Sequence, residues 1–179
     1  MKHMIHAAAL LLFVALALTS CHRTEVTGGD FDTDSDATVS ATSIQGQVLR
    51  FATTDIRGKA VTMDDYRDAK VIMVNRWEPW CGPCVGEMPD LQKLYANYKD
   101  KGLVVLGVYG TEEDAKEVVS ETGVQYPILL RTDDFAPFET EYVPTTFFVD
   151  GAGNVLNAEP VIGSRSYEEW EAVVKSYLS

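Results

Sequence analysis

The chain has 179 residues, of which 46% are hydrophobic and 10% aromatic. This is enough for one domain with a substantial core and short additional segments. The formal net charge of −12 argues against nucleic acid as a partner, because a phosphate backbone requires clustered Lys and Arg. The acidity otherwise indicates only a solvated surface that is disfavoured on anionic lipid.

The first twenty residues are typical of an export signal. Lys2 precedes an unbroken apolar run from residue 7 to residue 18, which is too short to cross a bilayer comfortably but suits the core of a signal peptide. The run ends in Leu-Thr-Ser-Cys21, which looks like a bacterial lipobox, where the signal is cut before a cysteine that is then acylated. We expect a lipoprotein signal over residues 1–20 and lipidation of Cys21. An ordinary secretory signal, or an uncleaved anchor, is the alternative.

The next segment is predicted to be a tether. Residues 22–40 are rich in Asp, Thr, Ser and Gly, and they show neither a helical nor a strand period. Such a composition buries too little apolar surface to fold. We therefore assign residues 21–43 to a lipidated cysteine and a flexible acidic tether, and residues 44–179 to a single domain.

Strands and helices alternate along that domain. Residues 47–55 alternate weakly, as in a strand, and a turn and a short strand follow before a single helical turn at residues 63–68. Residues 70–77 form an apolar, β-branched run typical of a central strand covered on both faces. Apolar residues then recur at helical spacing from Cys84 to Tyr98, and residues 102–110 predict a second buried strand.

The second half continues this pattern and ends differently. Residues 111–123 predict a helix with Thr111 at its start and Gly123 at its end, followed by a short strand at residues 126–131. A hairpin is expected to turn at residues 151–154, and residues 166–178 predict a closing amphipathic helix. The expected fold class is α/β, with a central mixed sheet flanked by helices and an N-terminal β extension.

Two cysteines, Cys81 and Cys84, lie where a predicted buried strand gives way to a predicted helix. Unpaired N–H groups and the positive end of the dipole at a helix N-terminus stabilise a thiolate. Pro83 suits the first turn of such a helix. We expect Cys81 to be an exposed nucleophile that attacks a substrate disulfide, and Cys84 to be the shielded thiol that resolves the mixed disulfide.

Three other interpretations of this pair are weaker. A structural disulfide that closes so short a loop constrains the unfolded chain very little. A zinc site needs two further ligands, and the predicted domain has no other Cys and no His; His22 lies in the tether. Inert core thiols fit poorly with the Gly-Pro between them and the flanking tryptophans. We expect redox chemistry with no metal and no cofactor besides the Cys81–Cys84 disulfide.

The sequence WCGPC after an apolar strand is the thioredoxin motif. The segment from residue 45 to the end resembles the TlpA/ResA-like branch of that superfamily, the exported, membrane-tethered thiol–disulfide oxidoreductases. Three stretches carry the resemblance: DIRGKAVTMDDYRDAKVIMVNRW, CGPCVGEMPDL and YVPTTFFVDGAGNV.

The resemblance implies roles for individual residues. Pro144 corresponds to the cis proline that lies against the cysteine pair, and Val143 would offer its backbone to a bound peptide as an added strand. Glu87 corresponds to a glutamate characteristic of the branch, which could tune or relay the proton of Cys84; the alternative is a solvated helix residue. Trp77 is expected in the core, and Trp80 on the surface that binds substrate.

The sequence also departs from the family pattern just before the motif. Asn75 stands where thioredoxins proper keep a buried aspartate, which fits the exported branch. Arg76, Glu78 and Pro79 replace the apolar and small residues usual there. A glutamate so near Cys81 should oppose its thiolate slightly unless Arg76 pairs with it.

The function implied by the resemblance is reduction of disulfides in exported proteins, for example apocytochrome c, on the extracytoplasmic face of a membrane. Electrons would come from a membrane thiol donor of the DsbD or CcdA type, and we expect a monomer. A disulfide-forming oxidant and a non-catalytic peptide-binding module are the alternatives.

Overall fold

The protein is described here by a computed structural model that covers residues 43–179. The expected signal peptide, Cys21 and nearly all of the tether lie outside the described residues. No helix in the described part is both long enough and apolar enough to cross a membrane. The elements follow in chain order: β1 (Ala52–Thr54), β2 (Ala60–Thr62), the 3₁₀ helix η1 (Met63–Tyr66), β3 (Val71–Trp77), α1 (Gly82–Tyr98), η2 (Lys99–Lys101), β4 (Leu103–Tyr109), α2 (Ala115–Thr122), β5 (Ile128–Leu130), η3 (Asp133–Phe138), β6 (Thr145–Val149), β7 (Val161–Ile162) and α3 (Tyr167–Leu178).

The centre of the domain is a five-stranded mixed sheet in the order β5-β4-β3-β6-β7. Strands β3, β4 and β5 run parallel, whereas β6 is antiparallel to β3 and β7 is antiparallel to β6. The two long central strands, β3 and β4, are nearly continuous apolar runs because both of their faces are covered. The expected α/β architecture is confirmed.

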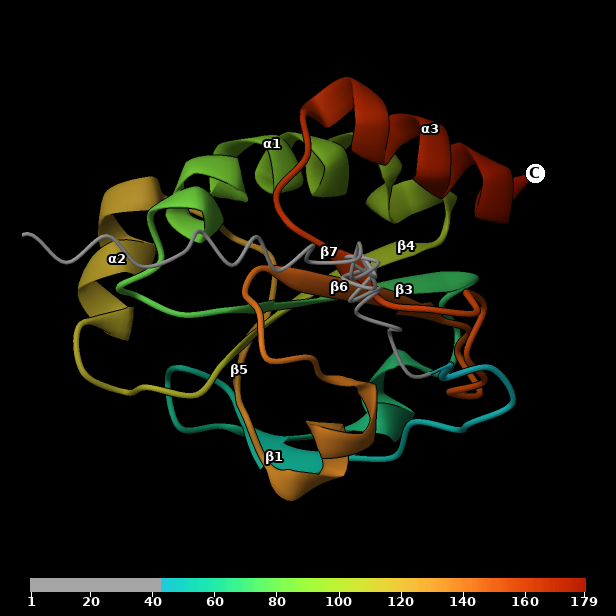
Figure 1. Cartoon of the computed structure of the whole chain (residues 1–179), viewed down its shortest axis with the longest axis horizontal. Helices are drawn as coiled ribbons and strands as arrows, with labels where there is room; N and C mark the ends of the chain where they lie inside the picture. The colour runs from blue at the N-terminus through green and yellow to red at the C-terminus, as the bar shows by residue number, and fades with distance from the viewer. Residues whose placement is uncertain (1–42) are drawn as a thin grey trace, which may run out of the picture. The chain divides into compact units, whose positions relative to one another are not determined.

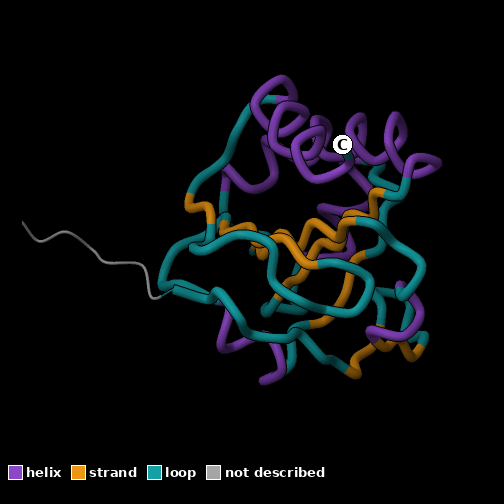
Figure 2. Tube along the Cα trace, turned by 90° about the vertical axis from the view of Figure 1, so that its right-hand side faces the viewer, coloured by secondary structure: helices purple, strands orange, loops and turns teal. Residues whose placement is uncertain are grey.

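Each face of the sheet carries a separate core. Side chains of α1, α2 and α3 pack on one face together with Val71 and Met73 of β3. Ile72 and Val74, which alternate with them, point to the other face and pack with residues of β2, η1 and η3. Figure 1 shows α1 and α3 above the sheet and β1 below it, and Figure 2 shows the same layering from the side.

The second helix begins later than the sequence pattern predicts. It starts at Ala115, after Asp114 in the left-handed region with φ 62°, and no side chain caps it. Thr111 is not its cap, because the helix starts only after Asp114; the Thr111 amide donates to a carboxylate oxygen of Glu78 at 3.0 Å. Gly123 ends the helix in the left-handed conformation, as expected.

The expected hairpin after β6 is present but its second strand is interrupted. The carboxylate of Asp150 accepts hydrogen bonds from the amides of Ala152 and Asn154, which fixes the turn. Farther along, the side-chain oxygen of Asn157 accepts from the amide of Phe148 and takes the place of a backbone partner. Strand β7 therefore pairs with β6 only from residue 161 onward.

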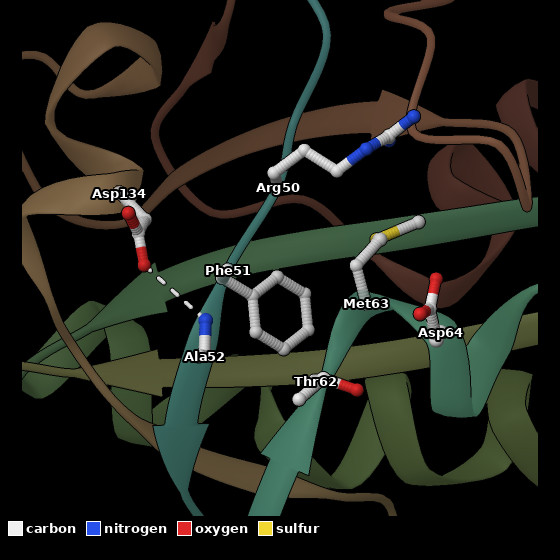
Figure 3. Close-up of a pocket in the computed structure, with 7 residues that line it drawn as sticks. All are labelled: Arg50, Phe51, Ala52, Thr62, Met63, Asp64 and Asp134. Carbon is white, nitrogen blue, oxygen red and sulfur yellow. Dashed lines mark hydrogen bonds between the residues drawn. The ribbon is translucent and has the colours of Figure 1, made fainter.

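A hollow of about 330 Å³ marks where the N-terminal extension meets η3 (Figure 3). The ring of Phe51 stacks on Phe135 with centroids 5.1 Å apart, and the amide of Ala52 donates to the Asp134 carboxylate at 3.2 Å. Phe51 and Phe135 belong to the core on the face opposite the cysteines. The hollow thus lies at the attachment of the extension, and the cysteines lie on the other face.

Candidate active site

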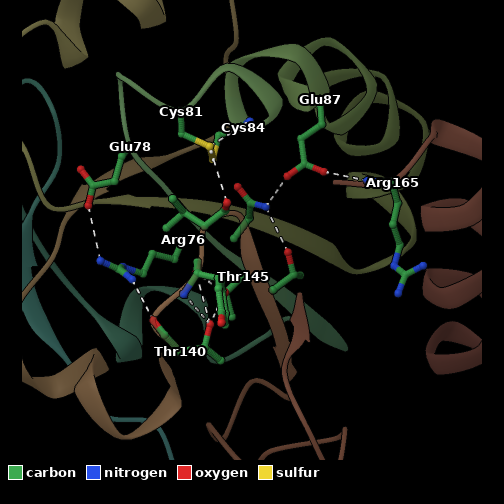
Figure 4. The surroundings of a disulfide bond; sticks show 12 residues. Arg76, Glu78, Cys81, Cys84, Glu87, Thr140, Thr145 and Arg165 are labelled. Atoms are coloured by element: carbon green, nitrogen blue, oxygen red, sulfur yellow. Dashed lines mark hydrogen bonds and ion pairs between the residues drawn. A yellow bond between two sulfur atoms is a disulfide. The ribbon is translucent and has the colours of Figure 1, made fainter. Parts of the chain in front are cut away.

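The two cysteines form a disulfide at the start of α1 (Figure 4). Strand β3 ends at Trp77, and the amide of Cys81 then donates to the carbonyl oxygen of Glu78 at 3.0 Å, which closes a tight turn. Cys81 is the N-cap of α1, and its Sγ accepts from the amide of Cys84 at 3.3 Å. Pro83 occupies the first turn, where it leaves no amide unsatisfied.

Cys81 is less accessible than expected. It is 5% exposed and Cys84 is 1% exposed, so the expectation of an exposed nucleophile is wrong for this disulfide state. The physical reason is that the Cys81 sulfur is bonded to Cys84 and lies 3.7 Å from the carbonyl oxygen of Val143. Cys84 is the more shielded of the two, in the order expected.

The loop before β6 faces the disulfide. The peptide bond between Val143 and Pro144 is cis, as the resemblance implied, and it places the Val143 carbonyl beside Cys81. Trp77 is fully buried and Trp80 is 71% exposed, so Trp77 is in the core and Trp80 on the surface as expected, while contact of Trp80 with a substrate stays a prediction. Tyr142, 49% exposed next to Val143, was missed by the sequence interpretation, although its position directly before the Val-Pro pair was a usable signal.

Glu87 is buried on the face of α1 that meets the sheet. Its Oε1 accepts from the side-chain amide of Asn75 at 2.8 Å, and its Oε2 accepts from the amide of Arg165 and from Nε1 of Trp170, both at 3.2 Å. The residue is 3% exposed, so the alternative of a solvated helix glutamate is wrong. Asn75 also donates to Thr146 at 3.0 Å.

This environment alters the acidity of Glu87. Burial raises the pKa of its carboxyl, while the hydrogen bonds from Asn75, Trp170 and Arg165 act in the opposite direction. A buried carboxyl with a raised pKa, placed one turn beyond Cys84, can take up and release a proton. Arg165 and Trp170 lie 78 and 83 residues farther along, and no sequence pattern linked them to Glu87.

The unusual residues before the motif form an ionic contact. A guanidinium nitrogen of Arg76 lies 3.6 Å from a carboxylate oxygen of Glu78. This is the pairing that was expected to offset the effect of Glu78 on the Cys81 thiolate. In residues 43–179, no group of three or more His, Cys, Asp or Glu side chains is arranged to hold a metal ion.

Comparisons with known proteins agree with this geometry. The model of the AhpC/TSA family matches residues 44–158. Thiol-disulfide oxidoreductase ResA from Bacillus anthracis is 31% identical over 129 residues, which cover 70% of this chain and 73% of that protein. The chain belongs to the AhpC/TSA family and is a TlpA/ResA-like thiol–disulfide oxidoreductase.

Other relatives agree with this assignment. ResA from Geobacillus kaustophilus is 29% identical over 141 residues, covering 76% of this chain and 79% of that protein. A structure from Chlorobium tepidum, assigned as a thiol:disulfide interchange protein DsbE, superimposes with a TM-score of 0.67 at 25% identity, covering 75% of this chain and 98% of that one. These matches confirm the predicted fold and reaction class. The individual roles of Cys81, Cys84, Glu87 and Pro144 stay predictions.

Proposed function

We propose that this TlpA/ResA-like protein is an extracytoplasmic, lipid-anchored reductase of protein disulfides. The apolar run at residues 7–18 and the Leu-Thr-Ser-Cys21 sequence support export and anchoring. The observation that carries the proposed reaction is the position of the disulfide, which lies at the start of α1 with the Val143 carbonyl 3.7 Å from Cys81.

The proposed reaction begins from the reduced dithiol. The Cys81 thiolate attacks one sulfur of a client disulfide, so that the client S–S bond breaks and its other sulfur leaves and takes a proton. The Cys84 thiol then gives up its proton and attacks the Cys81 sulfur. This forms the Cys81–Cys84 bond and releases the second client sulfur as a thiol. Two electrons pass from the protein to the client, and the two client thiols take up one proton that came from Cys84, by way of Glu87, and one from water.

In this proposal Glu87 handles the proton of the second step. When its carboxylate is ionised, its charge opposes the thiolate of Cys84 and keeps that thiol protonated until the mixed disulfide forms. The carboxylate can then accept the Cys84 proton, and the raised pKa that burial gives Glu87 favours this uptake.

The same electrostatics support reduction as the direction of the reaction. A dithiol becomes a strong oxidant when its reduced form is specially stabilised. Here Glu87 and Glu78 place carboxyl groups near the pair, and Arg76 is itself engaged by Glu78. Neither carboxyl group stabilises a thiolate, so we propose that the protein works as a reductant.

The clients are exported proteins with disulfides, apocytochromes c among them, and a membrane thiol donor of the DsbD or CcdA type would restore the dithiol. The exposed Trp80 and the backbone of Val143 would contact the client. The working form would be a monomer.

The reduction potential of the Cys81–Cys84 pair tests this proposal directly. We expect equilibration with glutathione to give a potential in the reducing range of thioredoxin, about −270 mV, rather than the oxidising range near −120 mV. Turnover of a protein disulfide such as insulin should accompany it. An oxidising potential would contradict the reductase and indicate a disulfide-forming enzyme. Absence of turnover would indicate a binding module.

A further inference from the structure

Arg76 lies near the end of β3 and contacts both loops that face the disulfide. One guanidinium nitrogen lies 3.6 Å from the carboxylate of Glu78, in the loop that leads to Cys81. Another donates to the carbonyl oxygen of Thr140 at 3.2 Å, in the loop that leads to Val143. Figure 4 shows the guanidinium between these two partners. One planar side chain therefore joins two segments that are about sixty residues apart.

Each partner of Arg76 is connected onward to the site. The carbonyl oxygen of Glu78 accepts from the amide of Cys81 at 3.0 Å. The hydroxyl of Thr140 lies 2.8 Å from that of Thr145, and the hydroxyl of Thr145 donates to the carbonyl oxygen of Tyr142. The contacts of Arg76 thus reach the backbone next to the attacking sulfur and the backbone next to Val143.

The network is also balanced in charge. Arg131 donates through Nε to both carboxylate oxygens of Glu139, at 2.7 and 2.9 Å, and Arg76 lies 3.6 Å from the same carboxylate. Glu78 is 4% exposed, and within residues 43–179 only Arg76 brings a basic group within 4 Å of its carboxylate. Without Arg76, a buried carboxylate without a cationic partner would remain in the loop that leads to Cys81, which is costly.

We propose that Arg76 is a positioning residue for disulfide exchange. It holds the Cys81 loop against the Val143–Pro144 loop, and it cancels the charge of Glu78, three residues before the attacking cysteine. This inference rests on the exchange reaction of the family and not on the proposed direction, client or location. The other charged groups around Cys81 stay constant in the test: Glu139 and Arg131 across the loop, Glu87 on α1, and the positive end of α1 itself.

Two single variants and their combination test the electrostatic part. Arg76→Met should raise the pKa of the Cys81 thiol by about half a unit, because an uncompensated negative charge opposes the thiolate. Glu78→Gln should lower that pKa by a similar amount, because its amide oxygen can still accept from Thr111 while the charge is gone. The double variant should return near the wild-type value.

The measurement is the pH dependence of Cys81 alkylation in the reduced protein, with the modified cysteine identified by mass spectrometry. Opposite shifts in the two single variants support the proposal. A merely structural network would lower the melting temperature in both and leave the pKa of Cys81 unchanged, which overturns it. If Arg76→Met fails to fold, the shift of the Cys81 pKa in the nearly isosteric Glu78→Gln variant still tests the proposal. None of these readouts depends on a client or on the direction of electron flow.

Arg76→Lys tests the loop-holding part. Lysine keeps the charge, but its single ammonium cannot reach Glu78 and Thr140 together as a planar guanidinium does. We expect a pKa of Cys81 near the wild-type value and a KM for a disulfide-bonded peptide raised several-fold, with little change in kcat. An unchanged KM would overturn this part.

Discussion

Asn75 and Glu87 face each other in the core on the helical side of the sheet, and their 2.8 Å hydrogen bond joins the central strand β3 to the helix that carries both cysteines. Asn75 also reaches Thr146 on β6. An asparagine amide can present either its nitrogen or its oxygen, and the threonine hydroxyl can donate or accept. The contact can therefore persist whether the Glu87 carboxyl is ionised or protonated, which suits a group that exchanges protons.

Glu87→Gln should lower the pKa of the reduced cysteine pair by about one unit, because the charge that opposes the Cys84 thiolate is removed. Reduction of a protein disulfide should slow roughly tenfold or more, because the variant cannot accept the Cys84 proton. Stability should change little, since Asn75 can turn its oxygen toward the new amide nitrogen. Thiolate absorbance, stopped-flow turnover and urea unfolding measure the three quantities.

Glu168→Gln is the matched control for this variant. Glu168 lies on the exposed surface at the start of α3, where water screens its charge from the sulfurs. It should leave both the thiol titration and the turnover unchanged. Superimposable thiol titrations for wild type and Glu87→Gln would contradict a role of Glu87 in the exchange.

The raised pKa of Glu87 also predicts how stability depends on pH. Between its unfolded value, about 4.3, and its higher folded value, the folded state binds more protons than the unfolded state. The free energy of unfolding therefore falls as the pH rises through this window. Below this pH window Glu87 is protonated in both the folded and the unfolded state, so it does not lower the free energy of unfolding there.

The measurement is urea unfolding of the oxidised protein from pH 4 to pH 8, because disulfide-bonded cysteines do not titrate. Wild type minus Glu87→Gln isolates the contribution of this one group. We expect the difference to move against the wild type as the pH rises. A flat difference would mean that the Glu87 pKa is the same in the folded and unfolded states.

The assignment of the two cysteines predicts different trapping behaviour. Cys84→Ser should accumulate a mixed disulfide between Cys81 and a client, because no thiol remains to resolve it. Cys81→Ser should trap far less, since Cys84 is only 1% exposed in the disulfide form. Non-reducing electrophoresis after incubation with an oxidised protein substrate compares them. Stronger trapping by Cys81→Ser would mean that Cys84 is the nucleophile and Cys81 the resolving thiol.

Trp80→Ala should weaken the interaction with protein clients and leave the fold intact. The side chain is 71% exposed, so its loss should change the free energy of unfolding by no more than about 0.5 kcal/mol. If Trp80 packs against a client, kcat/KM for insulin should fall roughly fivefold or more, whereas oxidised glutathione should react as before.

Leu156→Ala provides the comparison for Trp80→Ala. Leu156 is also a large exposed apolar residue, but it pairs with Phe148 near the end of β6 that lies away from Pro144. It should not affect insulin reduction. Equal losses in the two variants would show a general effect of surface hydrophobicity instead of a client contact at Trp80.

Cys21→Ala tests the anchor separately from catalysis. If Cys21 is acylated, fractionation should find the wild type in the membrane and the variant displaced or unprocessed. Mass spectrometry of the mature N-terminus should show a lipidated Cys21. A soluble wild-type protein whose mature chain starts at another residue would exclude the lipoprotein and leave export itself intact.

The sequence was most informative where local pattern and tertiary environment agree. The β-branched run of β3, the helical spacing of α1 and the CGPC pair between them predicted the central strand, the helix and the disulfide correctly. At α2 the sequence pattern placed the helix start too early: the helix begins after Asp114, which is left-handed, and the Thr111 amide is bonded to the Glu78 carboxylate from a neighbouring loop. Local propensity cannot report such a contact.

The site was predictable only in part for the same reason. Cys81, Cys84 and Pro144 belong to short motifs that the sequence shows directly. For Glu87 the sequence left two possibilities open, a role beside Cys84 and a solvated position on the helix. Its partners Arg165 and Trp170 come from the last loop and α3, and only the folded chain brings them to it. The contact between Arg76 and Thr140 likewise depends on how two distant loops meet.

The two edge strands of the central sheet, β5 and β7, offer few free backbone groups to another extended chain. Along β5, the amide of Ile56 donates to the carbonyl oxygen of Ile128, and Asp55 bridges to Leu129. At the opposite margin, β7 has only two residues and follows Pro160, which has no amide hydrogen to offer. Short or covered edge strands leave few unpaired N–H and C=O groups with which a strand of another chain could pair. If the domain binds partly unfolded client chains at Val143, as proposed, these edges protect it from aggregating with those chains along its own sheet.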